Sequence, residues 1–67
     1  MNTYYRTLVK EIRDNNDNIL LNIGDRVLTS DILENKKNEK VIWVFCHKGW
    51  FQVDFYYFSD KNVEKFT

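Results

Sequence analysis

The stretch VIWVFCHKGWFQVDFYYF, Val41–Phe58, is the part of the chain richest in residues that favour β-strands. Two apolar runs flank Lys48-Gly49, and glycine at the second position of a two-residue turn is typical of a tight β-hairpin. The spacing therefore predicts a hairpin that turns at Lys48-Gly49 and places His47 opposite Trp50.

Successive side chains of a strand point to opposite faces, so this hairpin has two distinct faces. One carries no charge and is the predicted core face, formed by Ile42, Val44, Cys46, Phe51, Val53, Phe55 and Tyr57. The other is aromatic but partly polar, and its members are Val41, Trp43, Phe45, His47, Trp50, Gln52, Asp54 and Tyr56.

The aromatic second face has two interpretations. In the first, the N-terminal segment or a closing barrel strand covers it, and its aromatic residues belong to the core. In the second, Trp43, Phe45, Trp50 and Tyr56 stay exposed until a partner binds, since large exposed apolar patches mark interaction sites. Trp and Tyr are also enriched among the residues that dominate interface energies.

Asn- and Asp-rich clusters divide the rest of the chain. Because these residues tolerate left-handed backbone and bond neighbouring amides, we expect turns or loops at Asp14–Asn18, Glu34–Lys40 and Ser59–Asn62. Ile19–Thr29 reads as a strand, a turn at Gly24 and a second strand. Ser30–Asn38 is predicted either as a short helix or as an extended loop.

The N-terminal segment Thr3–Arg13 carries conflicting signals. A helical stripe at three- and four-residue spacing is formed by Tyr5, Leu8, Val9 and Ile12. Its Tyr, Thr, Val and Ile residues favour a strand, although strict alternation fails at Arg6 and Lys10. We interpret the segment as a strand whose continuation forms a hairpin across Asp14–Asn18.

Gly24, Asp25 and Val27 follow the polar turn Asp14–Asn18 and open a strand with the pattern GD-x-V. This pattern resembles the start of a strand in small SH3-like barrels. Among these it most resembles the C-terminal module of YopX-type prophage proteins. Gly49–Phe51 resembles the start of a later strand of that module. The resemblance implies a small barrel of prophage or mobile-element origin that carries no catalytic residues. The fold expected for residues 1–67 is one mainly-β domain, either an SH3-like barrel or a strongly bent antiparallel sheet, with room for one short helix.

The composition argues against several classes of protein. Ten basic and ten acidic residues cancel, which is unlike the strongly basic balance of most nucleic-acid-binding domains. With one cysteine and one histidine, Cys46 and His47, the chain can form no internal disulfide and offers too few ligands for a zinc site. No segment reads as a membrane span or a signal peptide, so we expect a cytoplasmic protein without a cofactor.

No catalytic motif is present either. Cys46 and His47 are adjacent on a strand and therefore point to opposite faces, which separates the thiol from the imidazole. An EF-hand-like spacing of oxygen donors from Asp14 to Asp25 has Ile19 where a calcium loop requires glycine. We therefore expect no metal site and no enzyme activity.

The sequence favours a protein-interaction module that binds a host protein or a second copy of itself. The predicted binding residues are Trp43, Phe45, His47, Lys48, Trp50, Asp54 and Tyr56. Asp54 is expected opposite Trp43 and in a salt bridge. The alternative is a barrel that binds single-stranded nucleic acid, with the same aromatic residues stacking on bases and Lys36, Lys37 and Lys40 contacting phosphates.

Overall fold

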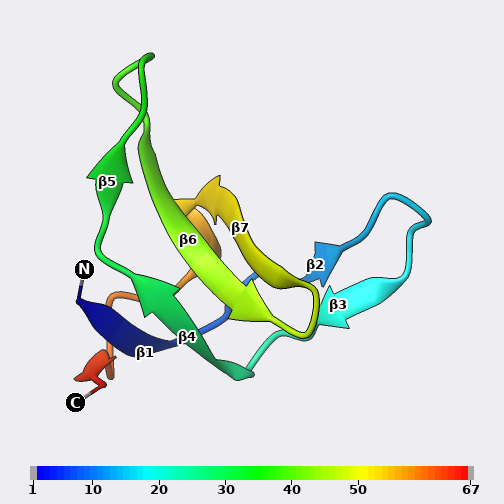
Figure 1. Cartoon of the computed structure of the whole chain (residues 1–67). Helices are drawn as coiled ribbons and strands as arrows, with labels where there is room; N and C mark the ends of the chain where they lie inside the picture. Colours follow the sequence, from blue (N-terminus) through cyan, green and yellow to red (C-terminus); the bar gives the residue numbers. More distant parts are fainter. Residues whose placement is uncertain (1, 67) are drawn as a thin grey trace.

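A computed structural model describes residues 2–66 as a curled antiparallel sheet with one short hairpin at its side (Figure 1). The six strands of the sheet are β1 (Thr3–Thr7), β4 (Arg26–Ser30), β5 (Leu33–Glu34), β6 (Lys40–Cys46), β7 (Gly49–Asp54) and β8 (Glu64–Lys65). Their order is β5-β6-β4-β1-β8, and β7 pairs with β6. The sheet bends into half a barrel, so the prediction of a mainly-β, strongly bent antiparallel fold is confirmed.

A separate two-stranded sheet, β2 (Ile12–Arg13) and β3 (Ile19–Leu21), projects from the side of the main sheet (Figure 1). It is the hairpin predicted across Asp14–Asn18. The chain between β1 and β2 is tied to the main fold by an isolated bridge from Leu8 to Phe58, the residue that follows the 3₁₀ turn η1 (Phe55–Tyr57).

Ser30–Asn38 forms no helix, so that alternative of the sequence prediction is wrong. Only Ile32 and Leu33 could give a helix here an apolar side. The chain instead bends after β4 and continues as β5, where Leu33 pairs with Val41 of β6. Both β4 and β5 therefore lie beside β6, and the bend between them adds to the curl of the sheet.

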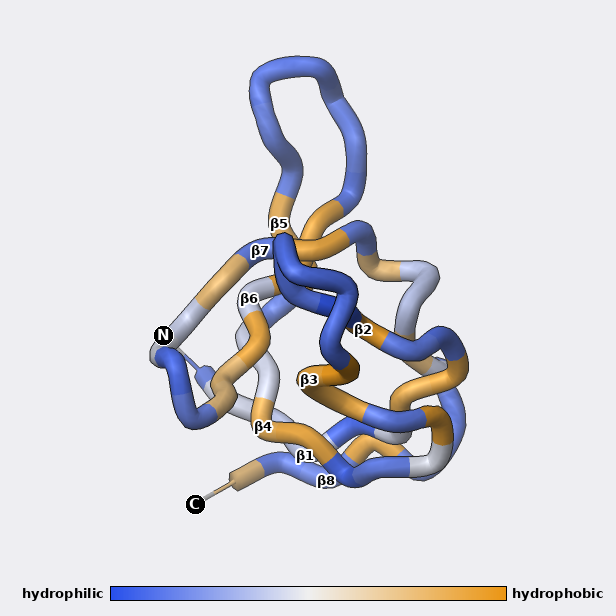
Figure 2. The backbone as a smooth tube through the Cα atoms, turned by 90° about the vertical axis from the view of Figure 1, so that its right-hand side faces the viewer, coloured by the Kyte–Doolittle hydropathy of each residue, from blue (hydrophilic) through white to orange (hydrophobic). Residues whose placement is uncertain are grey.

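The loops at Asp14–Asn18 and Asn35–Glu39 have the same geometry. In each, the first side chain accepts hydrogen bonds through its Oδ1 from the amides two and four residues further along, at 2.9–3.0 Å. The fourth residue, Asp17 or Asn38, has a left-handed φ of 65° or 61°. Figure 2 shows the second loop as a hydrophilic projection beyond β5. These two Asn- and Asp-rich clusters thus form turns, as predicted, because their side chains bond nearby amides and one residue of each adopts left-handed backbone.

The core lies on the concave side of the sheet. Its buried side chains are Leu8, Ile12, Val27, Ile42, Val44 and Phe58, with Leu20, Leu21, Phe51, Val53 and Tyr57 packed against them. Most of the predicted core face of the hairpin is therefore in the core, while Phe55 is exposed.

The predicted register of the long hairpin is wrong by two residues. The turn is His47-Lys48, so Cys46 pairs with Gly49 and Phe45 with Trp50. Gly49 has a φ of 102°, whereas His47 and Lys48 are not among the positive-φ residues. Glycine thus follows the turn, as in loops where a left-handed residue forms a bulge, instead of being its second residue. A shift of two residues leaves every side chain of β6 and β7 on its predicted face, whereas Phe55–Tyr57, predicted as strand, lie in η1.

Residues Thr3–Thr7 form a strand, which settles the ambiguous N-terminal segment. Tyr5 lies opposite Leu28 of β4, and Arg6 lies opposite Val27. Arg6 is buried, so the break in alternation at this position marks a charged side chain that points inward.

Candidate functional site

The convex face of the β6–β7 hairpin is open to solvent at Phe45, Trp50 and Gln52, whereas Val41, predicted on the same face, is buried. Phe45 is 48 % exposed and Trp50 is 41 % exposed, while Trp43 is half-buried. The rings of Phe45 and Trp50, which are directly opposed across the two strands, lie 5.3 Å apart and tilted by 57°. The interpretation in which another strand covers this face is therefore wrong for Phe45 and Trp50.

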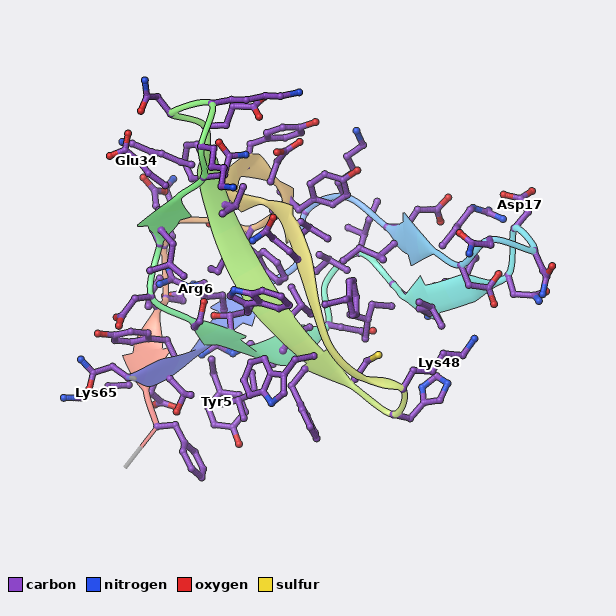
Figure 3. The ribbon with its side chains drawn as sticks, turned by 45° about the horizontal axis from the view of Figure 1, so that its top comes forward. Tyr5, Arg6, Asp17, Glu34, Lys48 and Lys65 are labelled. Atoms are coloured by element: carbon purple, nitrogen blue, oxygen red, sulfur yellow. The ribbon has the colours of Figure 1, made fainter. Side chains whose placement is uncertain are left out.

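The aromatic face continues across β4 and β1. Thr29 pairs with Val44, so in antiparallel register Leu28 is next to Phe45. Leu28 pairs in turn with Tyr5, which Figure 3 shows extending away from the sheet. The ring of Phe66, just after β8, packs edge-on against Tyr5 at 5.7 Å. We call this row the aromatic stripe and define it as Tyr5, Leu28, Trp43, Phe45, Trp50 and Phe66.

Three members of the stripe, Tyr5, Leu28 and Phe66, were not predicted. Strand alternation places Tyr5 and Leu28 on a face, but only the strand order shows that both lie on the same face as Phe45. Phe66 is 49 % exposed and is brought to Tyr5 by the pairing of β8 with β1. The sequence held no signal for that long-range pairing.

Asp54 lies at the end of β7 away from the turn, and its predicted environment is wrong. It pairs with Val41, whereas Gln52 occupies the position opposite Trp43. Within residues 2–66 the carboxylate of Asp54 forms no salt bridge. Asp54 instead lines a shallow polar depression together with Asn35 and Tyr57.

His47 and Lys48 form the turn at the end of the hairpin and are both exposed. Lys48 Nζ lies 3.4 Å from Oδ2 of Asp14, which joins this turn to the β2–β3 loop (Figure 3). Lys48 therefore already has a partner within the chain. Cys46 is buried on the core side, away from the exposed turn that carries His47.

Tyr56 does not belong to the stripe. The strand ends at Asp54, and Tyr56 lies in the 3₁₀ turn η1, 54 % exposed. Its ring is 5.2 Å from that of Tyr57, and Lys10 Nζ lies 5.3 Å and 4.8 Å from the two ring centres. Tyr56 thus forms a second, separate aromatic group with Tyr57 and Lys10.

In the part of the chain that the structure describes, no three His, Cys, Asp or Glu side chains come together in a group that could hold a metal ion. Nor does that part contain a helix long and apolar enough to cross a membrane. A scan against family models, a search of curated proteins and a search of solved structures gave no match to this chain.

Proposed function

We propose that this protein acts without catalysis, by binding another protein or a second copy of itself through the aromatic stripe. The observation that carries the proposal is the exposed Phe45–Trp50 pair, which continues into Tyr5 and Phe66 across the sheet. Large aromatic side chains packed in a row are the usual centre of a protein interface, and polar residues surround them. Here Gln52, Glu64 and Arg26 supply such a polar rim.

The charge distribution favours a protein over single-stranded nucleic acid. Lys36, Lys37 and Lys40 belong to the loop at the start of β6, and Phe45 is five residues further along the strand. At the rise of a β-strand, Lys40 is about 10 Å from Trp43 and about 17 Å from Phe45, and the other two lysines lie further along the loop. Arg26, the basic residue of the convex face, is held by Thr7 Oγ1 and the carbonyl of Asn62. Phosphate contacts normally supply most non-specific affinity for nucleic acid, and few cations adjoin the stripe.

The half-barrel also supports a finer proposal, that the fold is an SH3-like barrel. The strand path β8-β1-β4-β6-β7, the projecting β2–β3 hairpin and the 3₁₀ turn before the last strand support it. A prophage or mobile-element origin, with a host protein in the cytoplasm as the partner, rests on the GD-x-V resemblance at Gly24, Asp25 and Val27.

The test removes the stripe while keeping the strands. We expect Phe45→Thr/Trp50→Thr to stay folded, because threonine suits an exposed strand position and the ring pair contributes about 0.5–1.5 kcal/mol. Tyr56→Ser, an equally exposed aromatic residue outside the stripe, is the matched control. Circular dichroism verifies that both variants are folded.

Light scattering then gives the molar mass of each protein over a range of concentrations. If wild type and Tyr56→Ser are oligomeric and the double variant is monomeric, the partner is a second copy. If all are monomers, we expect wild type and Tyr56→Ser to retain a host protein that the double variant binds at least about thirtyfold more weakly. Equal retention by all three proteins, or binding to single-stranded DNA that weakens steeply with salt, would contradict the proposal.

A further inference from the structure

A second site lies at the open end of the half-barrel, on the other side of the sheet from the stripe. It is a cavity of about 270 Å³ between the bend of β4–β5 and the 3₁₀ turn. Its walls are largely apolar and come from Ile32, Ile42, Phe55, Tyr56 and Phe58, with Arg6, Ser59 and Asp60 as the polar members. Adjacent residues of β1 point to opposite sides, so Arg6 enters this cavity while Tyr5 belongs to the stripe (Figure 3).

Arg6 is the unusual residue of this cavity, because it is a buried cation that forms no salt bridge with a carboxylate of residues 2–66. Only 9 % of the residue is exposed. Its Nε donates a hydrogen bond to Thr29 Oγ1 at 2.9 Å, and its guanidinium lies 5.2 Å from the ring centre of Tyr4. Within residues 2–66, neither Nη atom forms a hydrogen bond or a salt bridge.

The free Nη groups face space that a ligand can enter. No side-chain nitrogen or oxygen of the described residues is both fully buried and unpaired, so the Nη atoms keep some accessible surface, and Arg6 lines the cavity. Burial lowers the pKa of Arg6, and the negative charge of Asp31 opposes that shift only in part. Of the donor atoms of Arg6, only Nε has a hydrogen-bond partner within residues 2–66, so the Nη groups are left for an anion that enters the cavity.

We propose that this cavity binds a carboxylate attached to an apolar or aromatic body, with the carboxylate on the Nη groups of Arg6. Two parallel N–H donors of a guanidinium match the two oxygens of a carboxylate. The apolar walls would hold the body of the ligand. An apolar cavity of about 150 Å³ already admits benzene, so 270 Å³ accommodates a small aromatic acid.

The charges around the cavity favour a monoanion over a phosphate. Among the described residues that line the cavity, Arg6 is the only cation, while Asp60 also lines it and Asp31 acts on Arg6 through its charge. A phosphate dianion would carry more negative charge than one guanidinium offsets and would be repelled by both carboxylates. This chemistry permits two sources for the ligand, a free aromatic acid or the C-terminal residue of a peptide.

The test uses ¹H–¹⁵N NMR titrations of the whole chain with phenylacetate, its neutral amide and phenyl phosphate. Acetyl-Gly-Phe with a free C-terminal carboxylate, and its amide, form the peptide arm. We expect the acid with the higher affinity to bind with a dissociation constant of roughly 1 mM or less, and about tenfold more tightly than its neutral amide analogue. Its binding should shift the backbone amide resonances of Phe55–Ser59. Whichever of the two acids binds the protein more tightly identifies the source of the carboxylate.

Arg6→Met keeps an apolar stem in place and removes the charge, and should weaken binding of the acid about tenfold. Arg26→Met, at an exposed guanidinium on the convex face, is the matched control and should bind as wild type does. Asp60→Asn should bind the acid more tightly, and this variant tests the proposal even if Arg6→Met does not fold.

Equal binding of acid and amide, unchanged binding to Arg6→Met, or no binding of either acid at millimolar concentration would overturn the assignment. These outcomes are independent of the stripe, since Phe45→Thr/Trp50→Thr should bind the acid as wild type does.

Discussion

Asp14 shows how one side chain organises a loop. Its Oδ1 accepts hydrogen bonds from the amides of Asn16 and Asn18, each at 2.9 Å, and its Oδ2 lies 3.4 Å from Lys48 Nζ. The hydrogen bond from the Asn18 amide, then that from Asn16 and the contact with Lys48, hold the pKa of this carboxyl below its ordinary value of 3.8. Asp14 thereby links the β2–β3 loop to the turn of the long hairpin.

This lowered pKa predicts an acid-sensitive contribution to stability. The unfolded chain binds a proton at Asp14 at a higher pH than the folded chain does, so stability rises with pH in that window. The contribution is complete above about pH 4 and is lost as the pH falls through the lower folded pKa. Asp14→Asn should keep the loop, because Asn35 has the same role in the other loop, but should lack this contribution.

Thermal unfolding of wild type and Asp14→Asn from pH 7 to pH 2, followed by circular dichroism, measures the difference. The control is Glu34→Gln, which changes an exposed carboxylate that forms no side-chain hydrogen bond or salt bridge within residues 2–66. Parallel pH profiles for wild type and Asp14→Asn would show that the hydrogen-bonded carboxylate does not contribute to stability.

The positions of two single residues, Arg6 and Tyr56, could not be predicted from their residue types. Arg6 disturbed the alternation of the N-terminal strand because it points inward, and a charged residue is normally assigned to the exposed face. Tyr56 was assigned to the hairpin because its residue type suits a strand, yet the strand ends at Asp54 and a 3₁₀ turn follows. In both cases the surroundings of the residue outweighed its type.

At the scale of elements, the sequence predicted which face each side chain of β6 and β7 occupies, but not which residues pair across the two strands. Ile42 and Val44 are buried and Phe45 is exposed, as alternation requires. The pairing differs because the predicted primed turn needs a positive φ at both Lys48 and Gly49, and only Gly49 has one. A two-residue shift is invisible to a face pattern of period two, so the sequence could fix the core side without fixing the register.

The turn geometry makes a prediction about glycine. Gly49→Ala should lower the free energy of unfolding by about 1–2 kcal/mol, because alanine disfavours a φ of 102°. Open space surrounds the position of the added methyl group, so the cost would come from the backbone and not from a clash. Lys48→Ala, next to it at a negative φ, should cost less than about 0.5 kcal/mol through its exposed ion pair.

Urea unfolding of the two variants and wild type gives these free energies. A Gly49→Ala variant as stable as wild type would contradict the left-handed backbone at Gly49.

At the scale of the whole molecule, the stripe arises from topology. Tyr5, Leu28, Phe45 and Phe66 are far apart in the sequence, and the strand order of the sheet aligns them. The sequence could predict the hairpin's share of the stripe, Trp43, Phe45 and Trp50, because those residues are local. It could not predict the rest, since pairing between distant strands depends on how the complete sheet packs.

The same topology separates the functions that we propose for the two sides of the sheet. The convex side carries the stripe, and the concave side ends in the cavity of Arg6. A small domain can thus present a protein-binding face and a ligand pocket without either one disturbing the other.

The most direct test of the stripe is photo-crosslinking in the cell from Gln52, an exposed residue opposite Trp43 on the convex face. The control places the same photoreactive amino acid at Lys36, in the projecting loop. We predict a discrete product from Gln52 that protease removes and nuclease does not, that is absent from Lys36, and that Phe45→Thr/Trp50→Thr abolishes. No product at Gln52, the same product at Lys36, or a product that nuclease removes would contradict the account of the stripe as a protein-binding face.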